Sequence, residues 1–149
     1  MKLKDYTAGE YYPGSLPKRL LWYFVSAFFF ETFFPWPSSL KVRLLRIFGA
    51  KVGAGVVMKP HIRIKYPWFL EIGDDVWLGE EVWIDNLAKV TIAANVCVSQ
   101  GAYLLTGSHD YKKESFDLIT KEIILQEGVW IGAKAVVCPG VTCGRSSVL

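Results

Sequence analysis

The chain has 149 residues, of which 52% are hydrophobic and 21% are charged, and its formal net charge at pH 7 is +3. This composition supplies enough apolar side chains for the core of one domain and excludes an intrinsically disordered polymer. The basic residues are spread out, so we expect no nucleic-acid partner. Cys97, Cys138 and Cys143 form no Cys-x-x-Cys pair, which favours reduced thiols in a cytoplasmic protein over a disulfide framework or a zinc site.

The first part of the chain, residues 1–51, is predicted to be an arm followed by helices. Residues 1–19 are rich in turn residues, and residues 20–34 (LLWYFVSAFFFETFF) form an apolar run. Fifteen helical residues would span about 22 Å, less than the roughly 30 Å of a bilayer's hydrocarbon core. The run follows a polar stretch and lacks a small-residue cleavage site, so we expect no cleavable signal sequence.

A second, amphipathic helix is predicted after Pro37, capped by Ser38 or Ser39 and stopped by Gly49. Two interpretations of the helical segment stay open. The helices pack on the body of the domain, or aromatic and basic residues hold the protein at a membrane surface, with Trp22 and Trp36 at the level of the headgroups. The second interpretation places the protein in the cytoplasm with peripheral contact to the inner face of the membrane.

From Val52 onward the sequence follows a six-residue repeat. The first position of each unit is aliphatic, apart from Met58 and Cys143, and the fifth is mostly small or β-branched. Such a repeat predicts a mainly β fold over residues 52–149, in which three short strands and three corners form each turn of a triangular coil, with neighbouring coils about 4.8 Å apart. The first positions are Val52, Met58, Ile64, Ile72, Leu78, Ile84, Ile92, Val98, Leu104, Leu125, Ile131, Val137, Cys143 and Leu149.

Glycine recurs at the second position of the units, where we expect a corner with no room for a Cβ atom. The register then breaks after His109: a new coil is expected at residue 110 but begins at Leu125. Residues 110–124 are therefore predicted to be an insertion that leaves the prism, and its length indicates a functional loop. The stacking register places Lys89 beneath His109.

Several segments resemble a known family. The units at 72–77, 131–136 and 137–142 resemble hexapeptide-repeat acyltransferases, which fold as left-handed parallel β-helices. More narrowly, KPHIRIKYPWFLEIG (59–73) and SQGAYLLTGSHDY (99–111) are similar to the colanic acid biosynthesis acetyltransferases. The resemblance implies O-acetylation of a saccharide hydroxyl by acetyl-CoA in exopolysaccharide assembly. It also implies homotrimers with active sites between subunits and a saccharide or lipid-linked saccharide acceptor.

His109 is the predicted general base. A free imidazole titrates near the pH at which enzymes work, and His109 matches the catalytic histidine of the Thr-Gly-x-His motif in sugar acetyltransferases. The alternative is that His109 caps a turn. His61 is interpreted as structural or exposed to solvent.

Asp85 and Asn86 are expected to contact the acceptor or to reach a neighbouring subunit's histidine, with a role in turn formation as the alternative. Asp110 competes for the role of orienting His109. Tyr111 and Asp117 are candidates for the acceptor pocket.

The coils after the insertion are expected to hold the pantetheine arm of acetyl-CoA, as the resemblance implies. The backbone N–H groups near Gly132 and Ala133 are candidate donors to the oxyanion. The candidate residues for this cofactor site are Trp130, Gly132, Ala133, Ala135, Pro139 and Gly140.

Three other functions stay open on the same prism. A γ-type carbonic anhydrase needs three histidine ligands per metal, and His61 and His109 are the two histidines here, so no metal is expected. Serine or another small molecule could replace the saccharide as acceptor. A non-catalytic scaffold is the third function, and it is favoured by the stop at Leu149, where the family continues with further coil and the cofactor site would be completed.

Overall fold

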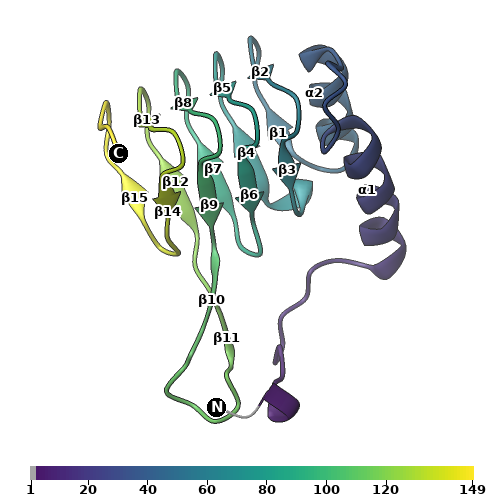
Figure 1. Ribbon diagram of the computed structural model, residues 1–149, viewed down its shortest axis with the longest axis vertical. Helices are drawn as coiled ribbons and strands as arrows, with labels where there is room; N and C mark the ends of the chain where they lie inside the picture. The colour runs from purple at the N-terminus through teal and green to yellow at the C-terminus, as the bar shows by residue number, and fades with distance from the viewer. Residues whose placement is uncertain (1–2) are drawn as a thin grey trace.

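The computed structural model describes residues 3–149 as a stack of coils with a helical cap at one end and a hairpin that projects from one corner (Figure 1). The cap consists of α1 (Leu16–Phe29) and α2 (Ser38–Ile47), and two short 3₁₀ turns lie at Leu3–Asp5 and Pro67–Phe69. The first strand begins at Lys51, one residue before the predicted boundary between the helical part and the β-helix.

The prism and the hairpin of the described residues are built from fifteen short strands. The strands are β1 (Lys51–Val52), β2 (Val57–Met58), β3 (Arg63–Ile64), β4 (Leu70–Ile72), β5 (Trp77–Leu78), β6 (Trp83–Asp85), β7 (Val90–Ile92), β8 (Cys97–Val98), β9 (Tyr103–Leu105), β10 (Gly107–His109), β11 (Leu118–Thr120), β12 (Ile123–Leu125), β13 (Trp130–Ile131), β14 (Val136–Val137) and β15 (Thr142–Cys143).

The chain winds as a left-handed parallel β-helix, which confirms the predicted fold class. Its three parallel sheets form the sides of the prism. Face 1 has the order β1-β4-β7-β12-β15, face 2 has β13-β8-β5-β2, and face 3 has β14-β9-β6-β3. Val52 aligns with Ile72 and Ile72 with Ile92, so the first coils do carry twenty residues, and Ile92 then aligns with Leu125. The first positions from Val52 to Val137 are buried and form the core.

Two different positions make the corners of each unit. The second-position glycines are needed because the next coil lies against them: a Cβ atom on Gly73 would lie 2.6 Å from the backbone nitrogen of Ala94. The left-handed backbone that turns the corner is at the fourth position instead, for example at Asn95 and Lys134, with φ of 59° and 58°. The prediction of crowding at the second position is thus right, and the turn itself lies two residues later.

The helical cap packs on the prism and contributes Trp22, Phe30, Leu45 and Phe48 to its core. Pro37, not Ser38 or Ser39, is the N-cap of α2, and the Ser38 hydroxyl instead accepts a hydrogen bond from the Met58 N–H at 2.9 Å. The predicted stop at Gly49 is confirmed, with the Gly49 and Ala50 N–H groups bonding to the carbonyls of Arg46 and Leu45.

Side chains of the cap donate hydrogen bonds to backbone carbonyls at the open edge of the first coil, on all three faces. Arg46 donates to the carbonyls of Val52 and Gly53, Lys41 to that of Lys59 at 2.9 Å, and Trp22 to that of Ile64 at 2.8 Å. The unpaired backbone groups of an edge strand can pair with another chain, and these bonds occupy the carbonyls that such a chain would use. Trp22 and Lys41 are buried by this role, so the expectation that Trp22 lies at the level of lipid headgroups is wrong.

The insertion begins earlier and ends earlier than predicted. Antiparallel β10 and β11 pair Gly107 with Thr120 and His109 with Leu118, and the Lys121 N–H closes the hairpin on the Thr106 carbonyl at 2.9 Å. The excursion therefore covers residues 107–120 and not 110–124. Lys89 lies beneath the start of β12, since its carbonyl accepts from the Ile123 N–H, so the predicted stacking of Lys89 under His109 is wrong.

Candidate active site between the hairpin and the prism

His109 lies on β10, away from the prism body, and its ring is fixed by three contacts. Its Nδ1 atom is 3.0 Å from the carbonyl oxygen of Phe116, and the Phe116 ring stacks on the imidazole with centroids 4.2 Å apart. The edge of the Tyr6 ring completes the enclosure at 5.5 Å. A carbonyl oxygen can only accept, so Nδ1 carries the proton and the lone pair of the neutral imidazole resides on Nε2.

Phe116 is a site residue that the sequence analysis missed. Its backbone has a φ of 50°, a left-handed conformation that is unfavourable for a bulky side chain. The turn from Asp110 to Phe116 sustains it through bonds from Lys113 N–H to Asp110 O and from Phe116 N–H to Lys113 O. A contact made by a main-chain carbonyl leaves no mark on residue type, so no sequence signal pointed to it.

Asp110 does not orient the imidazole within this chain. Its carboxylate accepts from the Lys112 N–H at 3.1 Å, and its own N–H bonds to the Asp117 carbonyl, so it shapes the hairpin turn. The predicted orienting role of Asp110 is therefore filled by Phe116.

Asp85 lies on face 3 of the prism and is largely buried. Its carboxylate pairs with Lys65 at 2.9 Å and accepts from the Tyr103 hydroxyl at 3.1 Å. Burial, together with the nearby Asp85 charge, raises the pKa of Tyr103 to about 12. These contacts involve no atom of His109, as the sequence analysis expected for a single chain.

Asn86 is fully buried, and both ends of its amide are used by the backbone. Its Nδ2 donates to the Tyr66 carbonyl at 2.6 Å, and its Oδ1 accepts from the Tyr66 N–H at 3.0 Å. This geometry favours the structural alternative for Asn86 over contact with an acceptor.

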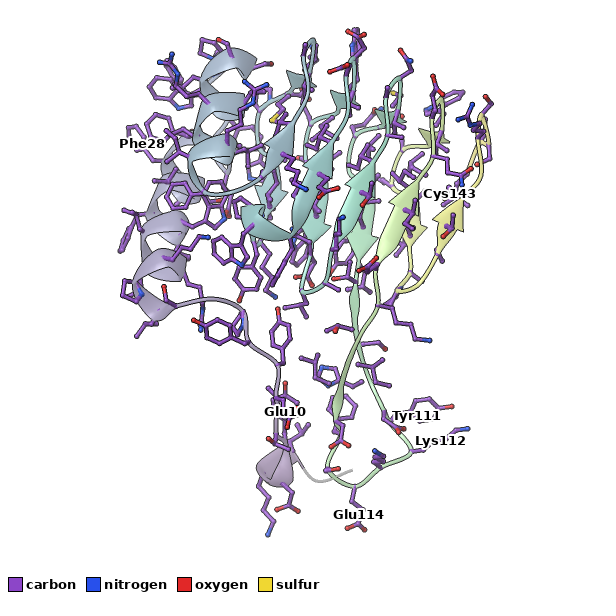
Figure 2. All side chains as sticks on the ribbon, turned by 180° about the vertical axis from the view of Figure 1, so that it is seen from behind. Glu10, Phe28, Tyr111, Lys112, Glu114 and Cys143 are labelled. Carbon is purple, nitrogen blue, oxygen red and sulfur yellow. The ribbon has the colours of Figure 1, made fainter. Side chains whose placement is uncertain are left out.

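The two candidate acceptor residues of the hairpin differ in their surroundings. Tyr111 is 74% exposed and points outward near the hairpin tip (Figure 2). Asp117 lines a cavity of about 440 Å³ between the N-terminal arm and β11, together with Tyr11 and Thr120. Hydrogen bonds from Ser115 and Lys113 lower the pKa of the Asp117 carboxyl, so it is an anion in this cavity.

The candidate cofactor residues divide between two corners of the prism. One group lies at and after β13 and consists of Trp130, Gly132, Ala133 and Ala135. Gly140 instead lies against the root of the hairpin, where its N–H donates to the Glu122 carbonyl. A Cβ atom on Gly140 would lie 3.0 Å from the Lys121 side chain. β14 lies between the two corners, and Pro139 directly precedes Gly140. The Gly132 N–H bonds to the Leu149 carbonyl at 2.7 Å, so in this chain it is not a free oxyanion donor.

A second cavity, of about 430 Å³, lies between α1 and face 3. Arg19, Trp83 and Asp85 line it, and Trp83 stacks on Tyr103 at 4.6 Å. Aromatic and charged groups side by side are the combination that suits a polar, ring-shaped ligand. Within residues 3–149, no group of three or more His, Cys, Asp or Glu side chains is placed to hold a metal ion.

The outward residues of the three faces differ in character. Face 1 presents mostly charged and polar side chains, with Glu71 paired to Lys51 and Lys89, and one exposed apolar residue, Ile124. Face 2 presents an aligned row of Val57, Trp77, Cys97 and Trp130, and face 3 presents Arg63, Trp83, Tyr103 and Val136.

Comparison with known proteins gives the family. No family model matches the chain. The putative colanic acid biosynthesis acetyltransferase WcaF of Escherichia coli is 39% identical over 140 residues, which cover 91% of this chain and 75% of WcaF. The chain belongs to the hexapeptide-repeat acetyltransferases. The predicted family and the predicted acyltransferase class are thereby confirmed.

Two other acetyltransferases of this family extend the comparison. The galactoside O-acetyltransferase of Escherichia coli is 29% identical over 118 residues, which cover 76% of this chain and 58% of that enzyme. A solved galactoside acetyltransferase in complex with coenzyme A aligns with a TM-score of 0.77 and 25% identity, over 89% of this chain and 67% of that one.

The fold is also that of a solved hexapeptide-repeat acetyltransferase from Vibrio cholerae, complexed with acetyl-CoA. It aligns with a TM-score of 0.79 and 23% identity, over 97% of this chain and 81% of that one. Acetyl-CoA is the co-substrate that the sequence analysis predicted.

Proposed function

We propose that this chain is an acetyl-CoA-dependent O-acetyltransferase that acetylates a hydroxyl of a saccharide, with His109 as the general base. The bond between Nδ1 of His109 and the Phe116 carbonyl carries this proposal, because it leaves the lone pair of Nε2 to accept a proton. Family membership supports acetyl transfer, and the relatives crystallised with acetyl-CoA or coenzyme A support the donor.

The reaction transfers one proton from the acceptor hydroxyl to His109 and then from His109 to the leaving thiolate. As the acceptor oxygen attacks the thioester carbonyl carbon, its proton passes to Nε2 of His109, and the Phe116 carbonyl stabilises the imidazolium through Nδ1–H. Collapse of the tetrahedral intermediate breaks the C–S bond, and the proton on Nε2 passes to the departing thiolate. Phe116 and Tyr6 hold the ring in one orientation through both transfers.

A saccharide acceptor is supported by the second cavity and by the relatives. Sugar rings stack on aromatic side chains and bond to carboxylates, and Trp83 and Asp85 offer both in one cavity. Among the relatives, the galactoside O-acetyltransferase is a saccharide-modifying enzyme by name. A role in exopolysaccharide assembly follows the name of the WcaF relative and stays a prediction.

A homotrimer is supported by the aromatic rows on two faces. A threefold ring joins unlike surfaces of neighbouring subunits, and the rows on faces 2 and 3 supply two such surfaces, whereas face 1 is mostly polar. In such a ring, face 3 of one subunit, with Asp85 and Trp83, can lie opposite a neighbour. Such a trimer would be needed for Asp85 to reach the histidine of a neighbouring subunit, as expected from the sequence.

The test replaces each histidine in turn. His109→Ala is expected to lower kcat by about a thousandfold, with coenzyme A binding and the melting temperature unchanged. His61→Asn is the matched control, because His61 has a φ of 57° that asparagine tolerates and stacks on Phe33, far along the chain from the hairpin. Release of free thiol, measured with a panel of saccharides, serine and other small alcohols as acceptors, gives both rates.

Two outcomes would contradict the proposal. Near-wild-type activity of the His109→Ala protein would show that His109 is not the general base. Failure of the wild-type protein to bind coenzyme A by calorimetry would favour the non-catalytic scaffold. Preference for serine over every saccharide would contradict the saccharide acceptor but leave His109 as the proposed base.

A further inference from the structure

The outward half of α1 is apolar although it faces solvent. Leu20, Leu21 and Phe24 are 51%, 60% and 66% exposed, and Phe28 is 62% exposed. The exposed residues of α1 and the turn that follows it are called the apolar cap face: Leu16, Leu20, Leu21, Tyr23, Phe24, Phe28, Phe33 and Phe34. A surface helix normally turns its polar residues outward, whereas α1 is apolar on its outward side as well as on the side that packs on the core.

The two charged residues of α1 lie outside the apolar cap face. Lys18 lies over the Trp68 ring at 4.3 Å, and Arg19 lies at the edge of the apolar cap face, where it lines the cavity beside face 3 together with Leu16 and Leu20. The inward half also holds buried Trp22 and Ser26. Exposed aromatic and leucine side chains gathered on one surface mark an interaction site in a folded protein.

Charge is segregated between the helical cap and the prism. Residues 16–51 contain six Lys and Arg and one Glu, a net charge of +5, whereas residues 52–149 contain nine Lys and Arg and eleven Asp and Glu, a net charge of −2. Lys41 is buried and Arg46 bonds to the Val52 and Gly53 carbonyls, whereas Arg43 is exposed on α2 of the same helical cap. An apolar surface in a basic surround matches the interface of an anionic bilayer.

The placement of α1 agrees with this partner. α1 crosses the end of the coil stack, and Phe28 lies on the outer side of the helix, pointing away from the coils (Figures 1 and 2). Its fourteen residues span about 21 Å. Among the described residues, no helix is long and apolar enough to cross a membrane, which is compatible with a helix that lies in the interface.

We propose that the apolar cap face docks on an anionic lipid bilayer. The aromatic rings enter the boundary between headgroups and acyl chains, and the exposed Arg43 of α2 contacts the lipid phosphates. The prism then stands with its coil axis away from the bilayer, so docking covers none of its three faces. One consequence rests on the proposed saccharide acetylation: docking brings the enzyme to saccharides carried on a lipid.

The experiment is flotation of the purified full chain with vesicles. Wild-type protein is expected to float with vesicles of phosphatidylcholine and phosphatidylglycerol, and roughly tenfold less with phosphatidylcholine alone. The triple variant Leu20→Ser, Phe24→Ser, Phe28→Ser is expected to bind the anionic vesicles at least about tenfold more weakly. The matched control, Tyr12→Ser, Ile124→Ser, Val148→Ser, replaces exposed apolar residues outside the apolar cap face and is expected to bind as wild type does.

Further measurements keep the test decisive if the triple variant does not fold. Arg43→Glu reverses one exposed charge on α2 and is expected to weaken binding to anionic vesicles alone. The proposal is overturned if wild-type protein does not float, if it binds neutral vesicles equally well, or if the triple variant binds as tightly as wild type. Sedimentation without lipid identifies the competing occupant: a wild-type assembly larger than that of the triple variant, with no flotation, assigns the face to a second copy of the chain.

Coenzyme A binding separates this test from the proposed function. A triple variant that binds coenzyme A but no longer floats supports docking. A wild-type protein that floats but does not bind coenzyme A leaves docking intact and overturns the acetyl transfer.

Discussion

The carbonyl oxygen of Phe116 lies 3.0 Å from Nδ1 of His109, and the aromatic ring of the same residue lies parallel to the imidazole at 4.2 Å. Phe116 therefore holds the candidate base in two ways, through a backbone atom that fixes the tautomer and through a side chain that fixes the plane of the ring. The two contributions can be separated by mutation, because the carbonyl remains when the ring is removed.

Phe116→Ala is expected to lower kcat by about tenfold and to leave the KM for acetyl-CoA unchanged, because the imidazole keeps its hydrogen bond but loses its stacking partner. In a His109→Ala background the same substitution is expected to have no further effect on kcat. Steady-state rates of the four proteins form a double-mutant cycle. Additive losses would show that Phe116 acts independently of His109.

Asn86→Ala distinguishes a structural residue from an acceptor contact. The substitution leaves the Tyr66 N–H without its partner in a partly buried site and removes one of the two bonds to the Tyr66 carbonyl, which keeps the Phe69 N–H, so we expect the free energy of unfolding to fall by about 2 kcal/mol. Urea denaturation measures this loss. A protein of wild-type stability with a raised KM for the acceptor would instead assign Asn86 to acceptor binding.

Tyr103 gives a stability change at alkaline pH. Its pKa in the folded protein, about 12, lies above the unfolded value of 10.0, so the folded state holds the proton more tightly. The resulting stabilisation is complete below the unfolded pKa and is lost as pH rises toward the folded pKa. The melting temperature of Tyr103→Phe is therefore expected to fall less steeply than that of wild type from about pH 10 to about pH 12. Identical slopes would contradict the raised pKa.

Arg46→Met tests the closure of the first coil. Three hydrogen bonds from Arg46 to the Val52 and Gly53 carbonyls are lost, and we expect destabilisation by about 2 kcal/mol and a greater tendency to aggregate through the opened edge. Arg43→Met removes an exposed cation from the same helix and is expected to change stability by less than about 0.5 kcal/mol. Thermal melts and light scattering measure both effects, and equal losses in the two variants would contradict the role of Arg46.

The repeat and the chemistry were predictable from the sequence to different extents. The buried first positions, from Val52 to Val137, followed from the six-residue period, because side chains that must share one core recur at a fixed spacing. The limits of the insertion did not follow, since Ser108 continues the small fifth position of the repeat although it lies on β10, which leaves the prism and pairs with β11. Spacing alone cannot tell a strand that stacks on the prism from one that leaves it.

The site residues show a second limit. His109 stays the predicted base because its type and motif are characteristic, whereas Phe116 contacts it through a backbone carbonyl, which every residue has. Asn86 and Trp22 were assigned to ligands because polar and aromatic residues often bind them. The structure uses them to satisfy backbone groups of Tyr66 and Ile64, a need that becomes visible only when the coils are stacked.

The hairpin that carries His109 closes on itself at its root, where the Lys121 N–H bonds to the Thr106 carbonyl, and its two strands bond to each other and not to the coils. The prism on either side therefore continues as if the residues between these two positions were absent. Residues 107–120 can change in length or composition, or open transiently, without unwinding a coil. In this architecture, selection can alter the candidate catalytic hairpin and the scaffold separately, so changes in the hairpin carry little risk to folding.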